Sequence, residues 1–163
     1  MDPSSILGLT LRRAGDADAQ GIRDLVAAAY GKYGPLIGRT PVPMLVDYTV
    51  AVREHDIWVL DAGAEIAGVI ELVPRDDHLW IENVAVAPSR QGRGLGRSLL
   101  AHAEAEARRL GLPQLGLLTN ERYEANIAMY TRHGFRETHR EPYQGTDLVH
   151  FRKPLGVAEA ANR

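Results

Sequence analysis

A segment rich in glycine and arginine is the part of the sequence whose residue types best suit the binding of an anion. It runs from Gln91 to Arg97 and has glycines at positions 92, 94 and 96. Glycines let the chain turn tightly and bring backbone N–H groups close to a ligand. The apolar periodicity from Leu95 predicts a helix, whose first turn adds unpaired N–H donors and the positive end of its dipole. With the guanidinium groups of Arg90, Arg93 and Arg97 nearby, the segment predicts a diphosphate pocket. The alternative is a tight strand-to-helix turn that binds nothing.

The glycine spacing excludes two common nucleotide-binding motifs. A P-loop starting at Gly92 and a dinucleotide fingerprint through Gly94 would both need a glycine where Arg97 stands. The pattern that fits is Gln/Arg-x-x-Gly-x-Gly/Ala, met by Gln91, Gly94 and Gly96. With this pattern the chain resembles the GNAT superfamily of N-acetyltransferases, in which the loop holds the pyrophosphate of acetyl-coenzyme A.

Three further segments carry the same resemblance, namely Glu82–Pro88, Leu115–Thr119 and Asn126–Phe135. Their order and spacing resemble the family from about Leu9 to Leu155, nearly the whole chain. The resemblance implies an N-acetyltransferase that moves an acetyl group from acetyl-coenzyme A to an amine by direct transfer in a ternary complex. The loop and the resemblance together indicate the following coenzyme-binding residues: Val84, Ala85, Val86, Gln91, Gly92, Arg93, Gly94, Leu95, Gly96, Arg97 and Asn126.

Acyl transfer from a thioester to an amine makes three demands on an enzyme. The ammonium must lose a proton, the oxyanion must be stabilised, and the departing thiolate must be protonated. The resemblance places Tyr130 close to the coenzyme sulfur, where its hydroxyl would act as a general acid. The alternative is a core tyrosine that packs on the sheet. Asn126 lies one helical turn earlier on the same face and by resemblance would bind the pantetheine arm, unless it is a surface or capping asparagine.

Glu82 is the best candidate for the general base. It lies in a strand flanked by apolar residues, where desolvation would raise the pKa of a carboxylate toward the working range. The alternative is a structural carboxylate in an ion pair. The apolar residues change parity between Ile81 and Val84, which indicates a β-bulge near Glu82 and Asn83. By resemblance, the N–H of Val84 would meet the thioester carbonyl, and Val86 would pair with the pantetheine arm as a strand does.

The sequence does not specify the acyl acceptor. By resemblance the acceptor pocket is shaped by Tyr30–Pro43 and His139–Asp147, and the acceptor would be a small-molecule or peptide amine. The first segment contains Lys32, Tyr33 and Arg39, and the second contains Arg140, Glu141, Tyr143 and Asp147. Such mixed content favours no single class of amine. Dimerisation is common in similar proteins, but the sequence carries no trace of it.

The composition narrows the class of protein further. There are no cysteines, which removes disulfides and an acyl-enzyme intermediate on a thiol. The six histidines are too scattered to predict a metal site. A net charge of −2 gives no general attraction to nucleic acid or to an anionic membrane. Without a secretory signal pattern or a membrane-spanning apolar stretch, a cytoplasmic protein is expected. The alternative to an enzyme is a catalytically inactive sensor or interaction module that binds acyl-coenzyme A.

Apolar patterns predict the elements that position these residues. Leu7–Leu11 alternates as a first strand. Asp16 is predicted to cap the following helix, whose buried face would hold Ile22, Leu25, Val26 and Ala29. Tyr30–Pro43 has three glycines and three prolines and is predicted as an irregular loop. Met44–Arg53 is predicted as a short helix.

The rest of the chain alternates strands and helices. The predicted elements are a hairpin (Ile57–Leu60 with Ile66–Val73), a strand (Leu79–Val86), a helix from Leu95 stopped by Gly111, a strand (Leu115–Thr119), a helix (Glu124–His133) and an antiparallel pair (Phe135–Thr138 with Leu148–Phe151). This order indicates an α+β or three-layer α/β fold. The resemblance implies a GNAT-like, mostly antiparallel mixed sheet flanked by helices. One acetyltransferase domain over residues 1–163 is expected, with a core of about 9–155 and a frayed tail at 156–163.

Overall fold

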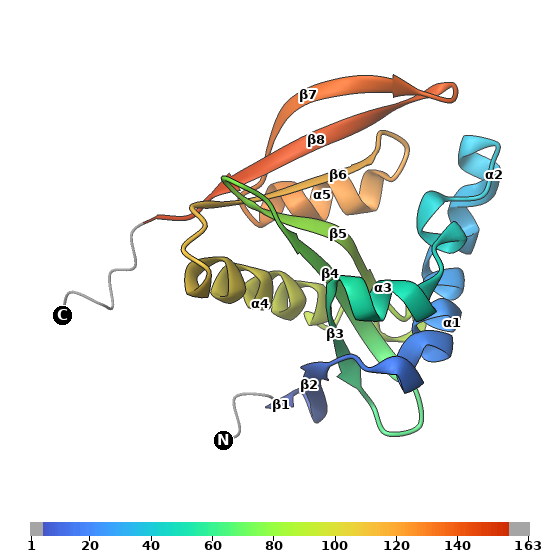
Figure 1. Cartoon of the computed structure of the whole chain (residues 1–163). Coiled ribbons are helices and arrows are strands. Elements are labelled where there is room, and N and C mark those ends of the chain that lie inside the picture. Colours follow the sequence, from blue (N-terminus) through green and yellow to red (C-terminus); the bar gives the residue numbers. More distant parts are fainter. Residues whose placement is uncertain (1–4, 157–163) are drawn as a thin grey trace.

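The structure, a computed structural model, describes residues 5–156 and is built on an eight-stranded sheet (Figure 1). The strands lie in the order β1-β2-β3-β4-β5-β6-β8-β7, and β5 and β6 form the parallel pair in an otherwise antiparallel sheet. Their bounds are β1 Ser5–Ile6, β2 Leu9–Arg13, β3 Asp56–Asp61, β4 Ile66–Pro74, β5 Leu79–Val86, β6 Gln114–Asn120, β7 Arg136–Tyr143 and β8 Thr146–Pro154. The predicted mixed, mostly antiparallel sheet is confirmed.

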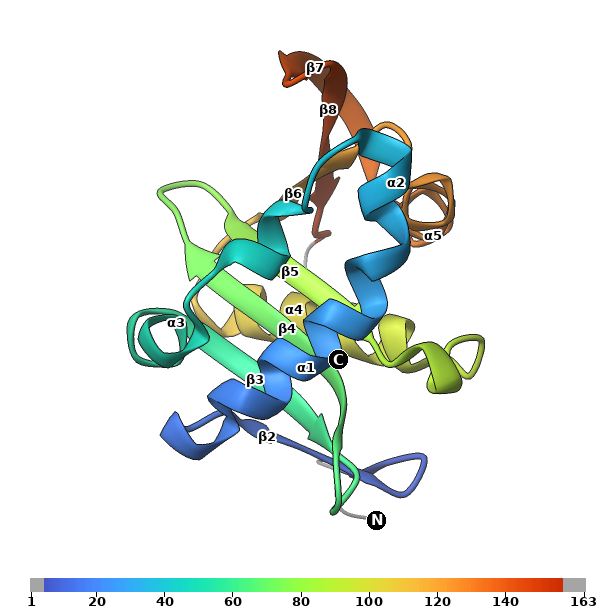
Figure 2. The same cartoon turned by 90° about the vertical axis from the view of Figure 1, so that its right-hand side faces the viewer.

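Helices cover both faces of this sheet. They are α1 Ala19–Tyr30, α2 Gly34–Ile37, α3 Tyr48–Glu54, α4 Leu95–Arg109 and α5 Glu124–Arg132. Figure 2 shows α1 and α3 in front of the central strands and α4 behind them. The molecule is therefore a three-layer structure, with the sheet as its middle layer.

Each face of the sheet has its own apolar core. The predicted inner face of α1 is buried as expected and packs with α3 on β3 and β4, through Ile22, Leu25, Val26 and Ala29. On the opposite face, α4 buries Leu99, Leu100, Ala103 and Ala107 beside the strands and α5. Burial of these two helical stripes, worth about 25 cal/mol per Å² of apolar surface, holds the layers together.

The predicted first strand is wrong in its first half. Leu7 and Gly8 form a turn with φ angles of 51° and 81°, and the Leu7 side chain is 68% exposed. β1 and β2 are the two arms of a small hairpin around this turn. A period-2 pattern alone does not separate one strand from two short strands joined by a two-residue turn.

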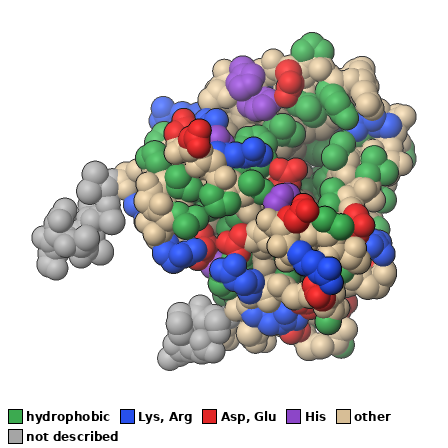
Figure 3. All heavy atoms as spheres, in the orientation of Figure 1, with side chains coloured by type: hydrophobic (Ala, Val, Ile, Leu, Met, Phe, Trp, Pro, Cys, Tyr) green, Lys and Arg blue, Asp and Glu red, His purple; other side chains and the backbone are tan. Residues whose placement is uncertain are grey.

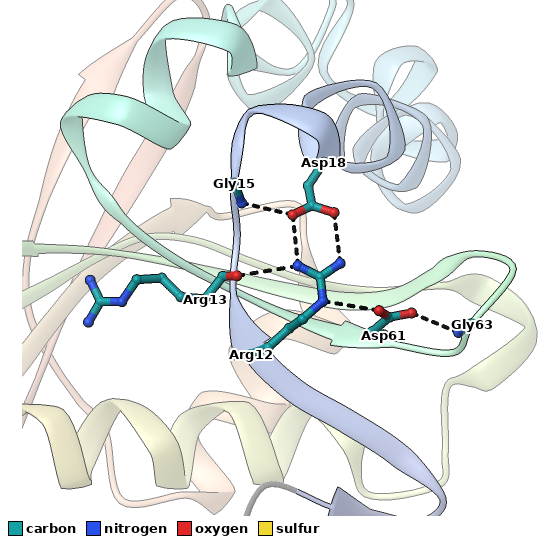
Figure 4. Close-up of polar contacts among 6 residues, drawn as sticks. All are labelled: Arg12, Arg13, Gly15, Asp18, Asp61 and Gly63. Carbon is teal, nitrogen blue, oxygen red and sulfur yellow. Dashed lines mark hydrogen bonds and ion pairs between the residues drawn. The ribbon is translucent and has the colours of Figure 1, made fainter.

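The start of α1 also differs from the prediction. Asp16 does not cap the helix with its side chain, and a short 3-10 turn precedes Ala19. Asp18 instead accepts two hydrogen bonds of 2.8 Å from the guanidinium of Arg12, and Arg12 Nε donates to Asp61 at 3.0 Å (Figure 4). Arg12 on β2 thereby joins the start of α1 to the end of β3.

The segment predicted as an irregular loop is mostly helical. A 3-10 turn, Gly31–Tyr33, continues directly from α1 and leads into α2. Pro35 lies in the first turn of α2, where a backbone N–H would have no acceptor within the helix, so proline's lack of one removes no hydrogen bond. Gly38 ends α2 with a φ of 71°. Glycine and proline here mark the ends of short helical turns, which composition alone did not resolve.

The helix predicted over Met44–Arg53 begins later than expected. α3 starts at Tyr48 because Asp47 caps it, with Asp47 Oδ1 accepting the N–H of Thr49 at 3.0 Å. The residues before it form a separate 3-10 turn, Val42–Leu45.

From β3 onward the predicted elements are confirmed closely. The β3–β4 hairpin, β5, α4, β6 and α5 match their predicted positions, and Gly111 follows α4 with a φ of 73°. β7 and β8 are longer than predicted and form a hairpin arm in which all of β7 is exposed. An exposed strand lacks the apolar alternation that would have shown its length. Of the predicted frayed tail, residues 157–163 lie outside the described residues.

The sheet opens at its parallel pair. β5 and β6 are paired at Leu79 with Leu115 and at Trp80 with Gly116. Beyond Trp80, β5 continues along β4 while β6 continues along β8, so the two strands diverge (Figure 1). The divergence leaves one edge of β5, from Ile81 to Val86, without a strand partner on that side.

Candidate active site

Beside this opening, the pairing of β5 with β4 is interrupted by a β-bulge. Leu72 pairs with Ile81 and Glu71 pairs with Asn83, so Glu82 is the additional residue. This confirms the bulge that the change in apolar parity predicted. A bulge redirects side chains and increases local twist, and it is a common device next to active sites.

The side chain of Asn83 holds the bulge in place through hydrogen bonds to two helices. This side chain is buried, and its Oδ1 accepts a hydrogen bond of 2.8 Å from the hydroxyl of Tyr30 at the end of α1. Asn83 Nδ2 also lies 3.4 Å from the hydroxyl oxygen of Tyr48 on α3, in a donor geometry. Burial raises the pKa values of both Tyr30 and Tyr48, so the two hydroxyls stay protonated at neutral pH. The two helices and the bulge are thus fixed to one another by buried side-chain hydrogen bonds.

A first cavity of about 440 Å³ lies where β5 ends and α4 begins. Its walls come from α1, from the last residues of β5, from the glycine-rich loop and from α5. In the loop, Gly92 and Gly94 have φ angles of 79° and 82°, and Gly94 is the N-cap residue of α4. Positive φ values are strained for other residues, which explains why glycines occupy these two positions.

Most of the residues predicted to bind coenzyme line this first cavity. They are Val84, Ala85, Val86, Gln91, Gly92, Gly94, Leu95, Gly96, Arg97 and Asn126. Arg93 is exposed and lies outside the lining. The side-chain amide of Gln91 donates to the carbonyl of Val86 at 3.2 Å and so ties the loop back to the end of β5. Gly96 has a different role from its neighbours, because a Cβ there would lie 3.0 Å from Met129 Sδ on α5.

The cations around the first cavity differ in part from those predicted. Arg97 lines the cavity as expected, whereas Arg90 lines it but pairs with Glu65 at 3.2 Å. Sequence reasoning missed Arg132 and His133 at the end of α5 and placed Lys32 on the acceptor side. The signal for the two α5 residues was available, since they follow Asn126 and Met129 at helical spacing. Lys32, Arg97 and Arg132 together give the lining of the cavity a positive charge that suits phosphate.

A second cavity of about 280 Å³ lies in the opening between β5 and β6. It is lined by β5 from Trp80 to Val84, by β6 from Leu117 to Asn120, and by aromatic residues of the surrounding loops. Figure 3 shows this side of the molecule hollowed beneath the β7–β8 hairpin, with hydrophobic side chains around the hollow. Tyr30 and Val84 line both cavities, so the two cavities meet at the bulge.

Tyr130 lines the second cavity and also belongs to the core. Its ring packs edge-on to Phe135, with 5.7 Å between centroids, and lies 6.2 Å from Phe151. Burial raises the pKa of its hydroxyl. Tyr130 is thus a core tyrosine that also lines the second cavity, and its role as a general acid stays a prediction.

Glu82 is exposed to solvent, so the expectation of a desolvated carboxylate is wrong. As the bulge residue it points out of the apolar layers, and its Oε2 accepts a hydrogen bond of 2.8 Å from Trp80 Nε1. It does line the second cavity. The predicted alternative of an ion-paired carboxylate does not match either, because the recorded partner is an indole N–H.

The desolvated carboxylate of this region is Glu71, which sequence reasoning missed. Glu71 is 2% exposed, and this burial raises the pKa of its carboxyl group. A hydrogen bond with His55, whose Nδ1 lies 2.5 Å from Glu71 Oε2, acts in the opposite direction and lowers the pKa by less than burial raises it. Glu71 lies across the strand pair from Asn83 and lines neither cavity. Its position inside the apolar run of β4 was the available signal.

The two predicted acceptor loops divide between the cavities. Arg39 and Tyr143 line the second cavity, whereas Lys32 and Tyr33 line the first. Arg140, Glu141 and Asp147 line neither. In the part of the chain that is described, no group of three or more His, Cys, Asp or Glu residues is arranged to hold a metal ion. No helix within residues 5–156 is both long and apolar enough to span a bilayer.

Comparison with known proteins identifies the family. The model of the acetyltransferase (GNAT) family matches residues 22–135, which is more than half of the chain. The chain is 38% identical over 73 residues to the [ribosomal protein bS18]-alanine N-acetyltransferase of Escherichia coli (strain K12). That match covers 44% of this chain and 49% of the relative, so the chain spans about half the length of the curated relatives it matches.

Solved structures agree over a longer range. The ribosomal-protein-S18-alanine N-acetyltransferase of Escherichia coli superposes with a TM-score of 0.73 at 22% identity, covering 92% of this chain and 96% of that chain. A GNAT family acetyltransferase from Elizabethkingia anophelis with acetyl-CoA bound gives 0.67 at 21% identity, covering 92% and 100%. At these identities the likeness is one of fold. The family match and the fold lead to one conclusion: the chain belongs to the acetyltransferase (GNAT) family.

Proposed function

We propose that the protein is an N-acetyltransferase that moves an acetyl group from acetyl-coenzyme A directly to an amine in a ternary complex. The observation that carries the proposal is the meeting of the two cavities at Tyr30 and Val84. A coenzyme in the first cavity and an amine in the second would face each other across the bulge. In the reaction the C–S bond of the thioester breaks, a C–N bond forms, the amine loses a proton and the thiolate gains one.

The first cavity would hold the coenzyme. The N–H groups of the Gly92–Gly96 loop and of the first turn of α4 would bind the pyrophosphate, with Arg97, Lys32 and Arg132 supplying positive charge. The edge of β5 from Val84 to Val86 would bind the pantetheine arm. Its backbone groups on this side have no strand partner, because β6 has already diverged. Asn126 would add a hydrogen bond from α5.

Tyr130 would protonate the departing thiolate. Because burial raises its pKa, its hydroxyl stays protonated at neutral pH and can donate a hydrogen bond to a developing negative charge. Glu82 would take the proton of the acceptor ammonium, directly or through a water molecule. Its support is its place in the second cavity and the hydrogen bond from Trp80 that orients its carboxylate. The sequence has no cysteine, which favours direct transfer over an acyl-enzyme on a thiol.

The proposal covers one acetyltransferase domain and leaves two acceptor classes, small-molecule and peptide amines. The Escherichia coli relative acts on an alanine of ribosomal protein bS18, by its name, whereas the walls of the second cavity suit a compact ligand. The competing proposal, a sensor that binds acyl-coenzyme A without turnover, uses the same first cavity. Transfer to any amine separates the two.

Calorimetric titration with acetyl-coenzyme A, followed by an assay of thiol release with a panel of amines, tests this function. Gly94→Val should abolish micromolar binding, since valine cannot adopt the φ of 82° that presents the loop N–H groups. Gly63→Val, at a φ of 89° in the β3–β4 turn, is the matched control and should bind normally if it folds. Undiminished binding by Gly94→Val would refute the loop assignment, and binding without transfer to any amine would favour the sensor.

A further inference from the structure

The walls of the second cavity combine opposite charges with apolar and aromatic surface. Arg39 lies between α2 and the 3-10 turn Val42–Leu45, and Glu82 is the bulge residue of β5. Both line the cavity, together with Trp80, Tyr123, Tyr143 and several aliphatic side chains. We propose that the acceptor is a small amine that carries a carboxylate on an apolar body, and that Arg39 binds this carboxylate. The inference rests on the proposed function and names the class of its acceptor.

Arg39 has an unused capacity for hydrogen bonding. Its guanidinium carbon lies 4.8 Å from the ring centroid of Tyr143, so the group is stacked on an aromatic face. Its Nε is shielded from solvent and has no hydrogen-bond partner among the described residues. The shielded Nε is out of a ligand's reach, but the terminal nitrogens of this half-buried side chain are not among the shielded atoms, so these donors are open to an anion in the cavity.

Several other arginines of the chain are satisfied by carboxylates, whereas others, such as Arg97 and Arg132, have no recorded ion pair within residues 5–156. Arg12, Arg53, Arg109 and Arg140 each form an ion pair with a carboxylate at 3.1 Å or less. Within residues 5–156 no ion pair is recorded for Arg39. A planar guanidinium offers paired donors that match a carboxylate, and stacking on a ring fixes its orientation. Arg39 is therefore placed as a recognition group for a carboxylate.

The charge of Arg39 acts inside the cavity. Burial raises the pKa of Tyr123, which lines the same cavity, and the positive charge of Arg39 opposes that rise. The guanidinium is thus close enough to influence a neighbouring wall residue. A carboxylate of the acceptor is negatively charged, so the positive charge of Arg39 would attract it.

The arrangement also gives the acceptor a direction. Glu82 attracts an ammonium group and lies at the bulge, two residues from Val84, where the second cavity meets the first. Arg39, on a different element, attracts the carboxylate. A ligand with both groups would present its amine toward the coenzyme, while the aromatic walls contact its apolar body. A cavity of about 280 Å³ suits a small ligand of this kind.

Matched pairs of amines that differ in one carboxylate test the inference. The pairs are 4-(aminomethyl)benzoate with benzylamine and phenylalanine with phenethylamine, each assayed for kcat/KM at saturating acetyl-coenzyme A. In at least one pair the carboxylate should raise kcat/KM by about 10- to 100-fold, the range for a charge-assisted hydrogen bond. Arg39→Gln should reduce the ratio of kcat/KM with the carboxylate to kcat/KM without it toward one. Arg39→Lys should keep part of this ratio, since lysine retains the positive charge but lacks the paired N–H donors of a guanidinium. Arg23→Gln makes the same charge change on the exposed face of α1 and should leave the ratio as it is.

The outcomes of this experiment either support or overturn the assignment of Arg39 to the acceptor carboxylate. A carboxylate preference that Arg39→Gln removes and Arg23→Gln leaves supports the inference. An equal or better rate with the unsubstituted amine in both pairs overturns it, as does a preference that survives Arg39→Gln. If the protein binds acetyl-coenzyme A but acetylates none of the four amines, while an alanine-initiated peptide is acetylated, the inference also fails and the proposed function stands. Failure to bind acetyl-coenzyme A would refute the proposed function itself.

Discussion

The hydroxyl of Tyr30 donates a hydrogen bond of 2.8 Å to Asn83 Oδ1, and both side chains are buried. This bond joins the last residue of α1 to the bulge of β5, 53 positions later in the chain. Tyr30 also lines both cavities. The bond therefore fixes the wall shared by the two cavities relative to the strand edge on which the reaction is proposed to occur.

Tyr30→Phe should lower both stability and turnover. The change leaves Asn83 Oδ1 buried without this partner, which should cost about 1–3 kcal/mol in the free energy of unfolding. A less constrained bulge should also reduce kcat more than it weakens coenzyme binding. Urea unfolding and steady-state kinetics measure the two effects. The control is Tyr33→Phe, because the buried Tyr33 ring stacks on Tyr123 and no hydrogen bond from its hydroxyl is recorded within the described residues. Equal losses in the two variants would show that the hydroxyl of Tyr30 has no special role.

Tyr130→Phe should depress turnover and leave coenzyme affinity nearly intact. Tyr130 lines the second cavity, whereas the coenzyme is proposed to occupy the first. Loss of a general acid lowers kcat by about 10²–10⁴-fold, and the packing of the ring on Phe135 and Phe151 is retained. Rapid-mixing assays of thiol release and calorimetry with acetyl-coenzyme A separate the two quantities. A kcat equal to that of the wild type would exclude the acid role.

Glu71 should make stability depend on pH in a defined direction. Burial raises its pKa above the ordinary value of 4.5, so the folded protein holds this proton at a pH where the unfolded chain has released it. The contribution of Glu71 to stability is therefore complete below pH 4.5 and is lost as the pH rises through the raised pKa of the folded state. Glu71→Gln removes this titration while keeping a hydrogen-bonding group beside His55.

Urea unfolding of the wild type and Glu71→Gln between pH 4 and 8 measures the effect. The free energy of unfolding of the wild type minus that of the variant should be largest at the acidic end and should fall to a plateau as the pH rises. A difference that stays constant, or one that grows with pH, would contradict the assignment of Glu71 as the desolvated carboxylate.

Much of the fold was predictable because its elements leave strong local patterns. The inner face of α1 and the run from β5 through α4 have clear periods of 3.6 and 2, and Gly111 after α4 has a φ of 73°, which favours glycine. The first hairpin and α2 were missed for the opposite reason. Leu7 continues the alternation through a turn, and the turns around Pro35 have the composition of a loop. Elements of two to four residues are fixed by packing and capping rather than by their own sequence period.

For the site, the sequence located the residues and misjudged their environments. The bulge was visible as a change of parity, but a parity change does not say on which side the additional residue lies, and Glu82 lies on the solvent side. Burial of Glu71 depends on tertiary contacts, since it pairs with Ile57 of β3 and contacts His55, which follows α3. Charge around the first cavity also depends on tertiary structure, since Arg93 in the loop and Arg97 in α4 lie four positions apart and only Arg97 lines the cavity.

That difference between neighbouring arginines gives a matched pair of variants. Both side chains are exposed, but Arg97 lines the first cavity on the first turn of α4, whereas Arg93 lies in the loop outside the lining. Arg97→Ala should weaken acetyl-coenzyme A binding by about 1 kcal/mol, or roughly fivefold in Kd, the scale of a partly exposed ion pair. Arg93→Ala, with the same loss of charge, should weaken it less. Because salt screens exposed charges, the affinity gap between wild type and Arg97→Ala should narrow as ionic strength rises from 0.05 to 0.5 M. Calorimetry at both ionic strengths measures this gap, and an equal or larger loss in Arg93→Ala would mean that the loop itself moves its arginine onto the phosphates when coenzyme binds.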